Sequence, residues 1–89
     1  MDLAQATDVV NAANALSLHN REACKATSTS GCYFCIRVFP SADISEFTDA
    51  AHDTALCPNC GMDAVLPGVT DPSLLSAAHL KWFVACPPL

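Results

Sequence analysis

Two short stretches decide the fold of this chain: Cys32-Tyr33-Phe34-Cys35 and Cys57-Pro58-Asn59-Cys60, which are separated by 21 residues. Each stretch has two residues between its thiols, so that one tight turn can aim both sulfurs at the same ion. A second turn of this kind completes a tetrahedron of sulfurs. The spacing therefore predicts one structural zinc ion, with four cysteine ligands. These ligands are Cys32, Cys35, Cys57 and Cys60.

Four cysteine ligands are compatible with two metals, zinc and iron. Rubredoxin-like proteins also hold iron with two such turns and tetrahedral sulfur ligation. Zinc is the commoner occupant, and we expect it here. Four protein ligands also leave no open coordination position for water or substrate. The sequence therefore favours a structural metal site and a protein that is not an enzyme.

The other cysteines and the histidines fall outside this spacing. Cys24 is interpreted as a small buried apolar residue and Cys86 as incidental. The polar stretch His19-Asn20-Arg21-Glu22 is expected to make hydrogen bonds at a helix end. None of the histidines has the spacing to replace a thiolate: His19, His52 and His79. The sequence also lacks an evident nucleophile with its base, and it lacks a phosphate-binding glycine loop.

The composition indicates a small domain that needs outside help to fold. Hydrophobic residues make up 52% of the 89 residues, but only 7% are aromatic. A core with so few large side chains is marginal, and domains of this size usually depend on a metal, disulfides or a partner subunit. We expect one domain over 1–89, which the metal stabilises because its ligands are gathered only in the folded state.

The charge of the chain argues against recognition of nucleic acid. Nine acidic and four basic residues give a formal net charge of −5. Four thiolates around a divalent ion would make it about two units more negative. A nucleic-acid-binding ribbon needs a basic face, whereas the basic residues here are scattered. They are Arg21, Lys25, Arg37 and Lys81. We therefore expect a protein partner, with nucleic-acid binding as the alternative.

The start of the chain indicates a cytoplasmic protein. Residues 1–8 lack the basic start and apolar run of a signal peptide. No stretch reaches the roughly 18 apolar residues of a membrane span. In the cytoplasm thiols stay reduced, so paired cysteines are expected to bind a metal, whereas a disulfide framework would require secretion.

Two helices are predicted on either side of the cysteine pairs. Residues 3–26 contain no proline or glycine, and their apolar residues recur at three- and four-residue steps, which predicts one amphipathic helix weakened near residues 17–20. This apolar helix could pair with a second copy in a homodimer. Asp71 and Pro72 suit the N-cap and first position of a second helix, over about 72–84.

Residues 31–66 form the predicted zinc ribbon between these helices. Short strands are expected at 36–39 and 44–48, with a turn at 40–43. Tyr33 and Phe34 lie within the first cysteine turn, where one side chain must point outward and can anchor a partner. The predicted fold class is α+β, a four-cysteine zinc ribbon of short antiparallel strands flanked by an N-terminal and a C-terminal helix.

The stretches 31–35 and 54–65 resemble those of a group of small, uncharacterised bacterial and phage proteins of the cytoplasm. In that group Gly-Cys-Phe-Tyr-Cys precedes Thr-Ala-Leu-Cys-Pro-Tyr-Cys-Gly-Ile-Asp-Ser-Val. The likeness extends upstream to 19–22 and downstream to a helix that ends in Trp82-Phe83. Asn59 stands where the group has an aromatic residue. The resemblance implies a zinc-ribbon-like protein and no particular activity. If the gene belongs to a phage, we expect the protein partner to be a host enzyme or complex that the protein regulates or inhibits.

Overall fold

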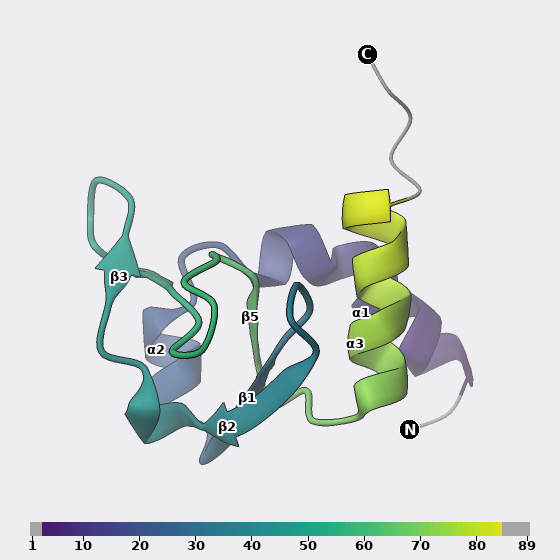
Figure 1. Ribbon diagram of the computed structural model, residues 1–89, viewed down its shortest axis with the longest axis horizontal. Helices are drawn as coiled ribbons and strands as arrows, with labels where there is room; N and C mark the ends of the chain where they lie inside the picture. The colour runs from purple at the N-terminus through teal and green to yellow at the C-terminus, as the bar shows by residue number, and fades with distance from the viewer. Residues whose placement is uncertain (1–2, 85–89) are drawn as a thin grey trace.

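A computed structural model describes residues 3–84 of the chain (Figure 1). A three-stranded antiparallel sheet, in the order β2-β1-β5, lies in the middle. Helices α1 and α3 pack at one end of it, and α2 with the small β3-β4 sheet lies at the other (Figure 1). The predicted α+β class, with short antiparallel strands between helices, is confirmed. No helix within the described residues is long and apolar enough to cross a membrane.

The central sheet positions the first cysteine turn. Strand β1 (Thr29–Cys32) pairs with β2 (Arg37–Pro40) on one side and with β5 (Val65–Pro67) on the other. Cys32 lies opposite Arg37 in the register, so residues 33–36 form the loop of the β1-β2 hairpin. The strand pairing therefore places Cys35, the second cysteine of the first pair, in this hairpin loop.

A smaller hairpin leads into the second cysteine turn. A 3-10 turn, η1 (Ser41–Asp43), is followed by β3 (Phe47–Thr48), which pairs with β4 (Thr54–Ala55). The strand predicted over 44–48 is therefore only its last two residues. Ile44 lies outside the β3-β4 pairing. Its side chain is part of the core and is 8% exposed.

The prediction of one helix over 3–26 is wrong, although the break falls where weakness was expected. Helix α1 (Leu3–Leu16) ends before residues 17–20, and α2 (Arg21–Lys25) starts after them. His19 takes a left-handed backbone conformation, with φ of 49°. The side chain of Asn20 is hydrogen-bonded to strands β4 and β5. These contacts are made outside the helix, so they stabilise the break.

The C-terminal helix follows the sequence prediction closely. Helix α3 (Pro72–His79) begins after Asp71, whose carboxylate accepts a 2.9 Å hydrogen bond from an amide of the first turn. It continues as a π-helical turn, η2 (Leu80–Val84). The Trp82 indole donates a 2.8 Å hydrogen bond to the carbonyl of Val10 in α1, which ties the two ends of the described chain together.

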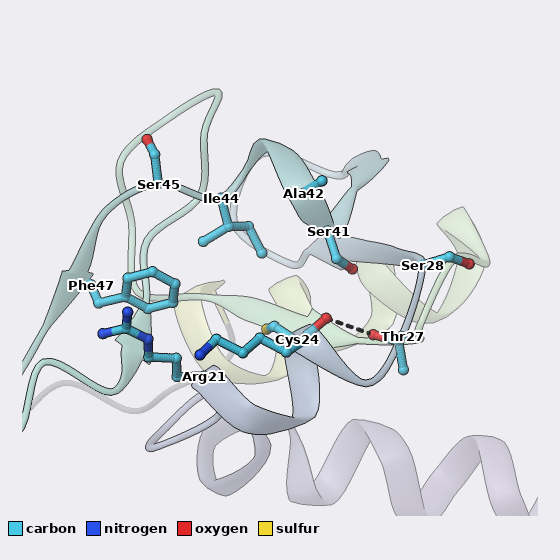
Figure 2. Close-up of a pocket in the computed structure, with 10 residues that line it drawn as sticks. Arg21, Cys24, Thr27, Ser28, Ser41, Ala42, Ile44, Ser45 and Phe47 are labelled. Atoms are coloured by element: carbon cyan, nitrogen blue, oxygen red, sulfur yellow. Dashed lines mark hydrogen bonds between the residues drawn. The ribbon is translucent and has the colours of Figure 1, made fainter.

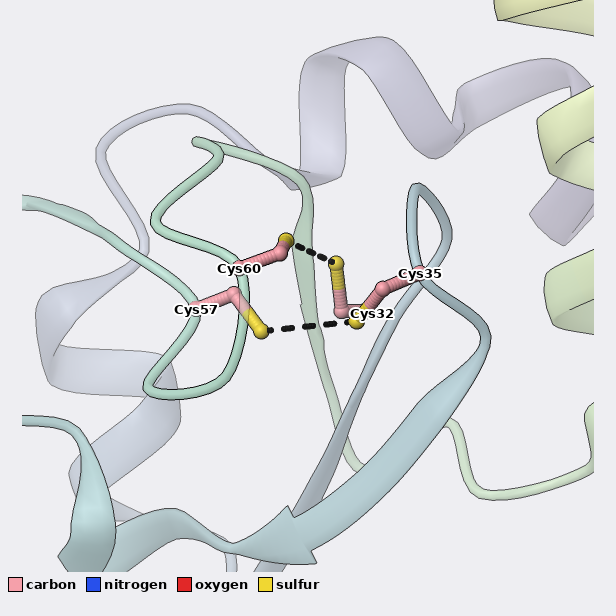
Figure 3. A group of neighbouring side chains, drawn as sticks. All are labelled: Cys32, Cys35, Cys57 and Cys60. Atoms are coloured by element: carbon pink, nitrogen blue, oxygen red, sulfur yellow. Dashed lines mark hydrogen bonds between the residues drawn. The ribbon is translucent and has the colours of Figure 1, made fainter.

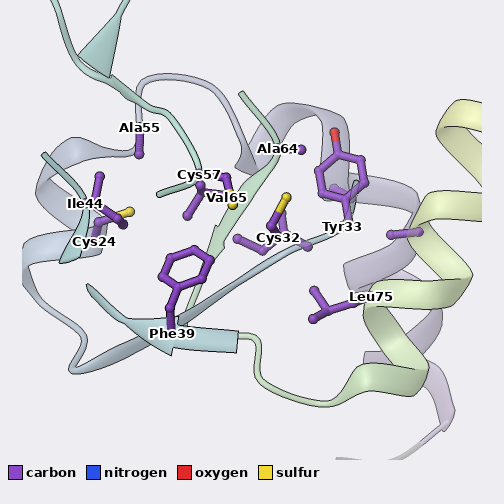
Figure 4. Packing of buried hydrophobic residues seen from close by; sticks show 13 residues of the cluster. Cys24, Cys32, Tyr33, Phe39, Ile44, Ala55, Cys57, Ala64, Val65 and Leu75 are labelled. Atoms are coloured by element: carbon purple, nitrogen blue, oxygen red, sulfur yellow. The ribbon is translucent and has the colours of Figure 1, made fainter. Parts of the chain in front are cut away.

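The core combines a few large side chains with many small ones (Figure 4). Leu66, Leu75 and Val65 are its largest fully buried hydrophobic residues, and four alanines are fully buried with them, Ala13, Ala55, Ala64 and Ala78. Small residues let the backbones approach closely. A methyl group at Gly31 would lie 2.4 Å from the carbonyl oxygen of Val69 and 2.8 Å from a Leu75 methyl, so only glycine fits there.

Candidate metal centre

The structure brings together the four cysteines of the two turns (Figure 3). The sulfurs of Cys32 and Cys60 are 3.7 Å apart, as are those of Cys35 and Cys57. All four lie within 4.8 Å of one another. Sulfurs bound tetrahedrally at about 2.3 Å from a zinc ion are about 3.8 Å apart. The four thiols are therefore positioned to bind a metal ion.

Each turn directs a backbone amide at its own first sulfur. The amide of Phe34 donates to Cys32 Sγ at 3.4 Å, and the amide of Asn59 donates to Cys57 Sγ at 3.3 Å. Such bonds favour a thiolate over a thiol, and this is the form in which cysteine binds a metal.

The two turns also share a left-handed residue immediately after the second cysteine. Gly61 has φ of 80°, and Ile36 occupies the equivalent place with φ of 61°. Their amides donate to the carbonyls of Cys57 and Cys32, at 2.9 and 3.0 Å. A β-branched residue in this region is strained, whereas glycine is not. The first turn is therefore the less favourable of the two in this respect.

Backbone hydrogen bonds connect the two turns independently of any ion. The amide of Tyr33, within the first turn, donates to the carbonyl of Ala64 at 3.0 Å, just beyond the second turn. The amide of Cys57 donates to the carbonyl of Met62 at 2.9 Å and closes the second turn. These backbone hydrogen bonds therefore help to hold the four sulfurs close together.

The four cysteines, called the tetrad, differ in their exposure to solvent. Cys32 is completely buried and Cys57 is 3% exposed, whereas Cys35 is half-buried and Cys60 is exposed. Burial raises the pKa of the Cys32 thiol well above its usual range, and the neighbouring Cys57 and Cys35 raise it further, against backbone hydrogen bonds that lower it. A divalent ion reverses this preference, because it stabilises the thiolate.

The two partly accessible thiols differ in their surroundings. For Cys60, burial is the main cause of a raised pKa. For Cys35, burial raises the pKa, but hydrogen bonds from the Asn59 side chain and from the neighbouring thiols together lower it below its ordinary value. Asn59 therefore contacts the site directly.

His79 supports the first turn, a role that the sequence did not reveal. Its Nδ1 donates to the carbonyl of Tyr33 at 3.1 Å, and its ring meets Phe34 edge-on at 5.8 Å. Tyr33 is buried, with its hydroxyl 3.3 Å from that of Ser17. Burial raises the pKa of Tyr33. Phe34 is therefore the aromatic residue of the turn that points outward.

A second group of polar side chains lies at the break between α1 and α2. His19 Nδ1 is 2.9 Å from a carboxylate oxygen of Asp53 and 3.9 Å from one of Asp49. The hydrogen bond to Asp53 and the charges of both aspartates raise the pKa of His19. Thr54 donates to Asp49 and accepts from the backbone amide of His19. These bonds hold the break against the β3-β4 hairpin, which agrees with the predicted hydrogen-bonding role at a helix end.

The remaining candidates stay away from the sulfurs. Cys24 is 3% exposed and belongs to the core, as predicted, and its burial raises the pKa of the thiol. His52 is exposed and lies in the β3-β4 loop. Within the described residues, neither His19 nor His52 nor His79 joins the cysteine group. Cys86 lies outside the described residues.

Comparison of the chain with protein-family models, with curated proteins and with solved structures gave no match. The class of protein is therefore defined by the fold and the site. It is a small α+β protein in which two cysteine turns place four thiols around one point, with the geometry that a tetrahedral metal ion requires.

Proposed function

We propose that the chain is a non-enzymatic zinc protein of the cytoplasm that acts by binding another protein through an aromatic surface beside the metal. The surface consists of Phe34 on the first cysteine turn together with Leu80, Phe83 and Val84 of η2, and all four side chains are exposed. We call these four residues the aromatic surface. The thiolate tetrad supports zinc as the ion, since it is the commonest occupant of such sites.

One observation carries this proposal: an exposed aromatic ring is part of the metal-binding turn itself. Phe34 and Phe83 are each 39% exposed, and their rings meet edge-on at 4.9 Å. Tyr33 and His79 pack against Phe83 at 5.4 and 5.6 Å. Rigid aromatic side chains on an ordered support lose little entropy on binding, and such residues dominate the energetics of protein interfaces.

The resemblance to small bacterial and phage proteins supports a more specific form of the proposal. A phage-encoded regulator or inhibitor of a host protein complex needs a compact, stable recognition surface and no catalytic site. Four thiolate ligands are consistent with this, because they leave no coordination position for a substrate.

The test is the capture of a partner with purified, zinc-loaded protein. Wild-type protein and the Phe34→Ser and Phe83→Ser variants are incubated with bacterial cell extract, and the bound proteins are identified by mass spectrometry. Val38→Ser is the matched control, because Val38 is an exposed apolar residue on β2 (42%) and is not part of the aromatic surface. We expect the wild type and the control to retain a common partner that both phenylalanine variants lose. Equal capture by all four proteins would remove the aromatic surface from the proposal.

A homodimer is the proposed alternative use of the apolar surface. Helix α1 packs against α3 and β5, and two large apolar side chains are exposed at and just after its end, Leu16 (43%) and Leu18 (42%). Light scattering of the purified protein at several concentrations distinguishes the two, because a homodimer through this helix end dissociates when Leu16 and Leu18 are changed to serine.

Iron and a redox role form the second candidate function, because the same thiolates and the same amide–sulfur bonds would also stabilise an iron site. Native protein that is colourless, contains one zinc per chain and shows no redox transition excludes it. Nucleic-acid binding is tested by a gel-shift experiment at low salt, where electrostatic attraction is strongest. Arg21 and Lys25 lie together on α2, but Arg37 is on β2 and Lys81 is on η2, so the four basic residues are divided among three elements and we expect no shift.

A further inference from the structure

We infer that a pocket between α2 and residues 41–47 binds a small organic anion that joins an apolar body to a carboxylate or phosphate group. The pocket has a volume of about 670 Å³ and is shown in Figure 2. This volume is in the range of pockets for small ligands. None of the four metal-site cysteines and no member of the aromatic surface lines it, so the inference is independent of the proposed function.

The pocket concentrates positive charge in an acidic chain. The chain has four basic residues and a net charge of −5, yet Arg21 and Lys25 both line this pocket. No aspartate or glutamate is among the described residues that line it. A concave site with one sign of charge attracts ions of the opposite sign more strongly than a flat surface does. The charge therefore selects an anion.

Arg21 is held in place before any ligand binds. Its guanidinium carbon lies 4.4 Å from the centre of the Phe47 ring, and its Nη1 donates to the carbonyl of His52 at 3.0 Å. Within the described residues it makes no ion pair, so its remaining N–H groups are free to bind a carboxylate or phosphate. An immobilised arginine loses little conformational entropy when a ligand binds.

Lys25 is the more mobile of the two cations. It forms an ion pair of 3.7 Å with Glu22 one turn earlier, and both side chains are largely exposed. Exposed pairs of this kind contribute little free energy and are easily exchanged. Lys25 can therefore leave Glu22 and contact an anion in the pocket.

The rest of the pocket explains why the ligand also needs an apolar body. Ile44 and Phe47 face Cys24 of α2 across the hollow (Figure 2), and the Phe47 side chain is only partly buried, so it leaves apolar area for a ligand to cover. A hydrated inorganic ion would leave this surface unused, whereas an aromatic or branched aliphatic group would cover it. Burial of that apolar area adds to the affinity.

The test is a titration of uniformly ¹⁵N-labelled, zinc-loaded protein with four small probes, followed by two-dimensional NMR. Phenyl phosphate and benzoate combine an aromatic ring with an anion. Benzyl alcohol has the ring without the charge, and inorganic phosphate has the charge without the ring. We expect the first two to shift the amides of residues 21–28 and 41–47 with saturation in the millimolar range. We expect benzyl alcohol and inorganic phosphate to bind at least tenfold more weakly.

Substitutions then locate the binding charge. Arg21→Gln and Lys25→Gln should each weaken phenyl phosphate binding several-fold, and added salt should weaken it in the wild type. Arg37→Gln is the matched control, because it removes one positive charge from β2, outside the pocket. Lys25 is exposed, so its variant keeps the fold even if Arg21→Gln does not. No shifts in the two segments, equally tight binding of benzyl alcohol or inorganic phosphate, or an equal effect of Arg37→Gln would each overturn the inference.

Discussion

The carboxamide of Asn20 donates a 2.8 Å hydrogen bond to the carbonyl of Val65, 45 residues further along the chain. Its oxygen accepts a 3.0 Å bond from the amide of Ala55. Val65 lies on β5 and Ala55 on β4, which belong to different sheets. The amide of Tyr33 donates to the carbonyl of Ala64, so that carbonyl points toward β1. Successive carbonyls in a strand point to opposite sides, so the carbonyl of Val65 points away from β1, toward the outer edge of β5. One buried side chain therefore joins the two sheets as a peptide group would.

Replacement of Asn20 by alanine should destabilise the protein by about 3 kcal/mol, because it leaves a buried carbonyl and a buried amide without partners. Asn20→Asp should also be strongly destabilising, since a carboxylate cannot donate to Val65 and would be buried. Denaturant unfolding of the zinc-loaded protein measures both. Asn14→Ala is the control, because Asn14 is exposed on α1 and its loss should change stability by less than about 0.5 kcal/mol. Equal effects of the two alanine variants would contradict this account of Asn20.

Removal of the second pair of thiols should abolish both metal binding and cooperative folding. Structural zinc in small domains contributes on the order of 10 kcal/mol, more than most domains of this size can lose. We expect the Cys57→Ser/Cys60→Ser double variant to contain no zinc by elemental analysis and to show no cooperative thermal transition by circular dichroism. Cys24→Ala should keep one zinc per chain, because Cys24 is buried away from the tetrad. A double variant that melts like the wild type would refute the metal centre.

The left-handed backbone conformation of Gly61, after the second turn, predicts how much stability a substitution there would cost. A methyl group at Gly61 would have no atom within 4 Å, so Gly61→Ala has only the backbone conformation, with φ of 80°, to oppose it. This should cost about 1 kcal/mol. Gly61→Asn should cost less, because asparagine tolerates this conformation better than alanine does. Thermal melts of the two zinc-loaded variants measure the difference, and an asparagine variant less stable than the alanine variant would contradict the backbone explanation.

His19 should make stability depend on pH. Its hydrogen bond and attraction to Asp53, with a smaller contribution from Asp49, raise its pKa in the folded protein above the ordinary 6.5. The stabilisation is therefore fully present below about pH 6.5 and is lost as the pH rises through the folded pKa. Ring NMR should report a raised pKa for His19 and a lower one in Asp53→Asn. Because the His19 side chain is 64% exposed and that of Asp53 is 34% exposed, salt should reduce the shift. An unchanged His19 pKa in the variant would exclude this pairing.

Local chemistry was enough to predict the two cysteine turns and the start of the C-terminal helix. Amide–sulfur bonds, the left-handed Gly61 and the Asp71 cap all depend on residues within a few positions of one another. The two residues between the cysteines of each pair were enough to predict that both pairs converge on one site. The predicted strands and helices around the pairs gave the α+β class.

Long-range partners determined what the sequence did not reveal. The helix break depends on Asn20, whose partners are 35 and 45 residues away, and His19 meets Asp53 at a separation of 34. Nothing in the local pattern indicates these pairs. The sequence required one aromatic residue of the first turn to point outward, but only the packing of Tyr33 against Ser17 decides that it is Phe34.

The uneven burial of the tetrad has a consequence for oxidative damage. When all four sulfurs are bound to an ion as thiolates, access decides which one peroxide reaches first, and Cys60 is the exposed one of the four whereas Cys32 is completely buried. We expect Cys60 to be the first residue converted to sulfenic acid, with release of the ion as its first effect. Trapping with a sulfenic-acid reagent and peptide mapping would show modification of Cys32 before Cys60 if this order is wrong.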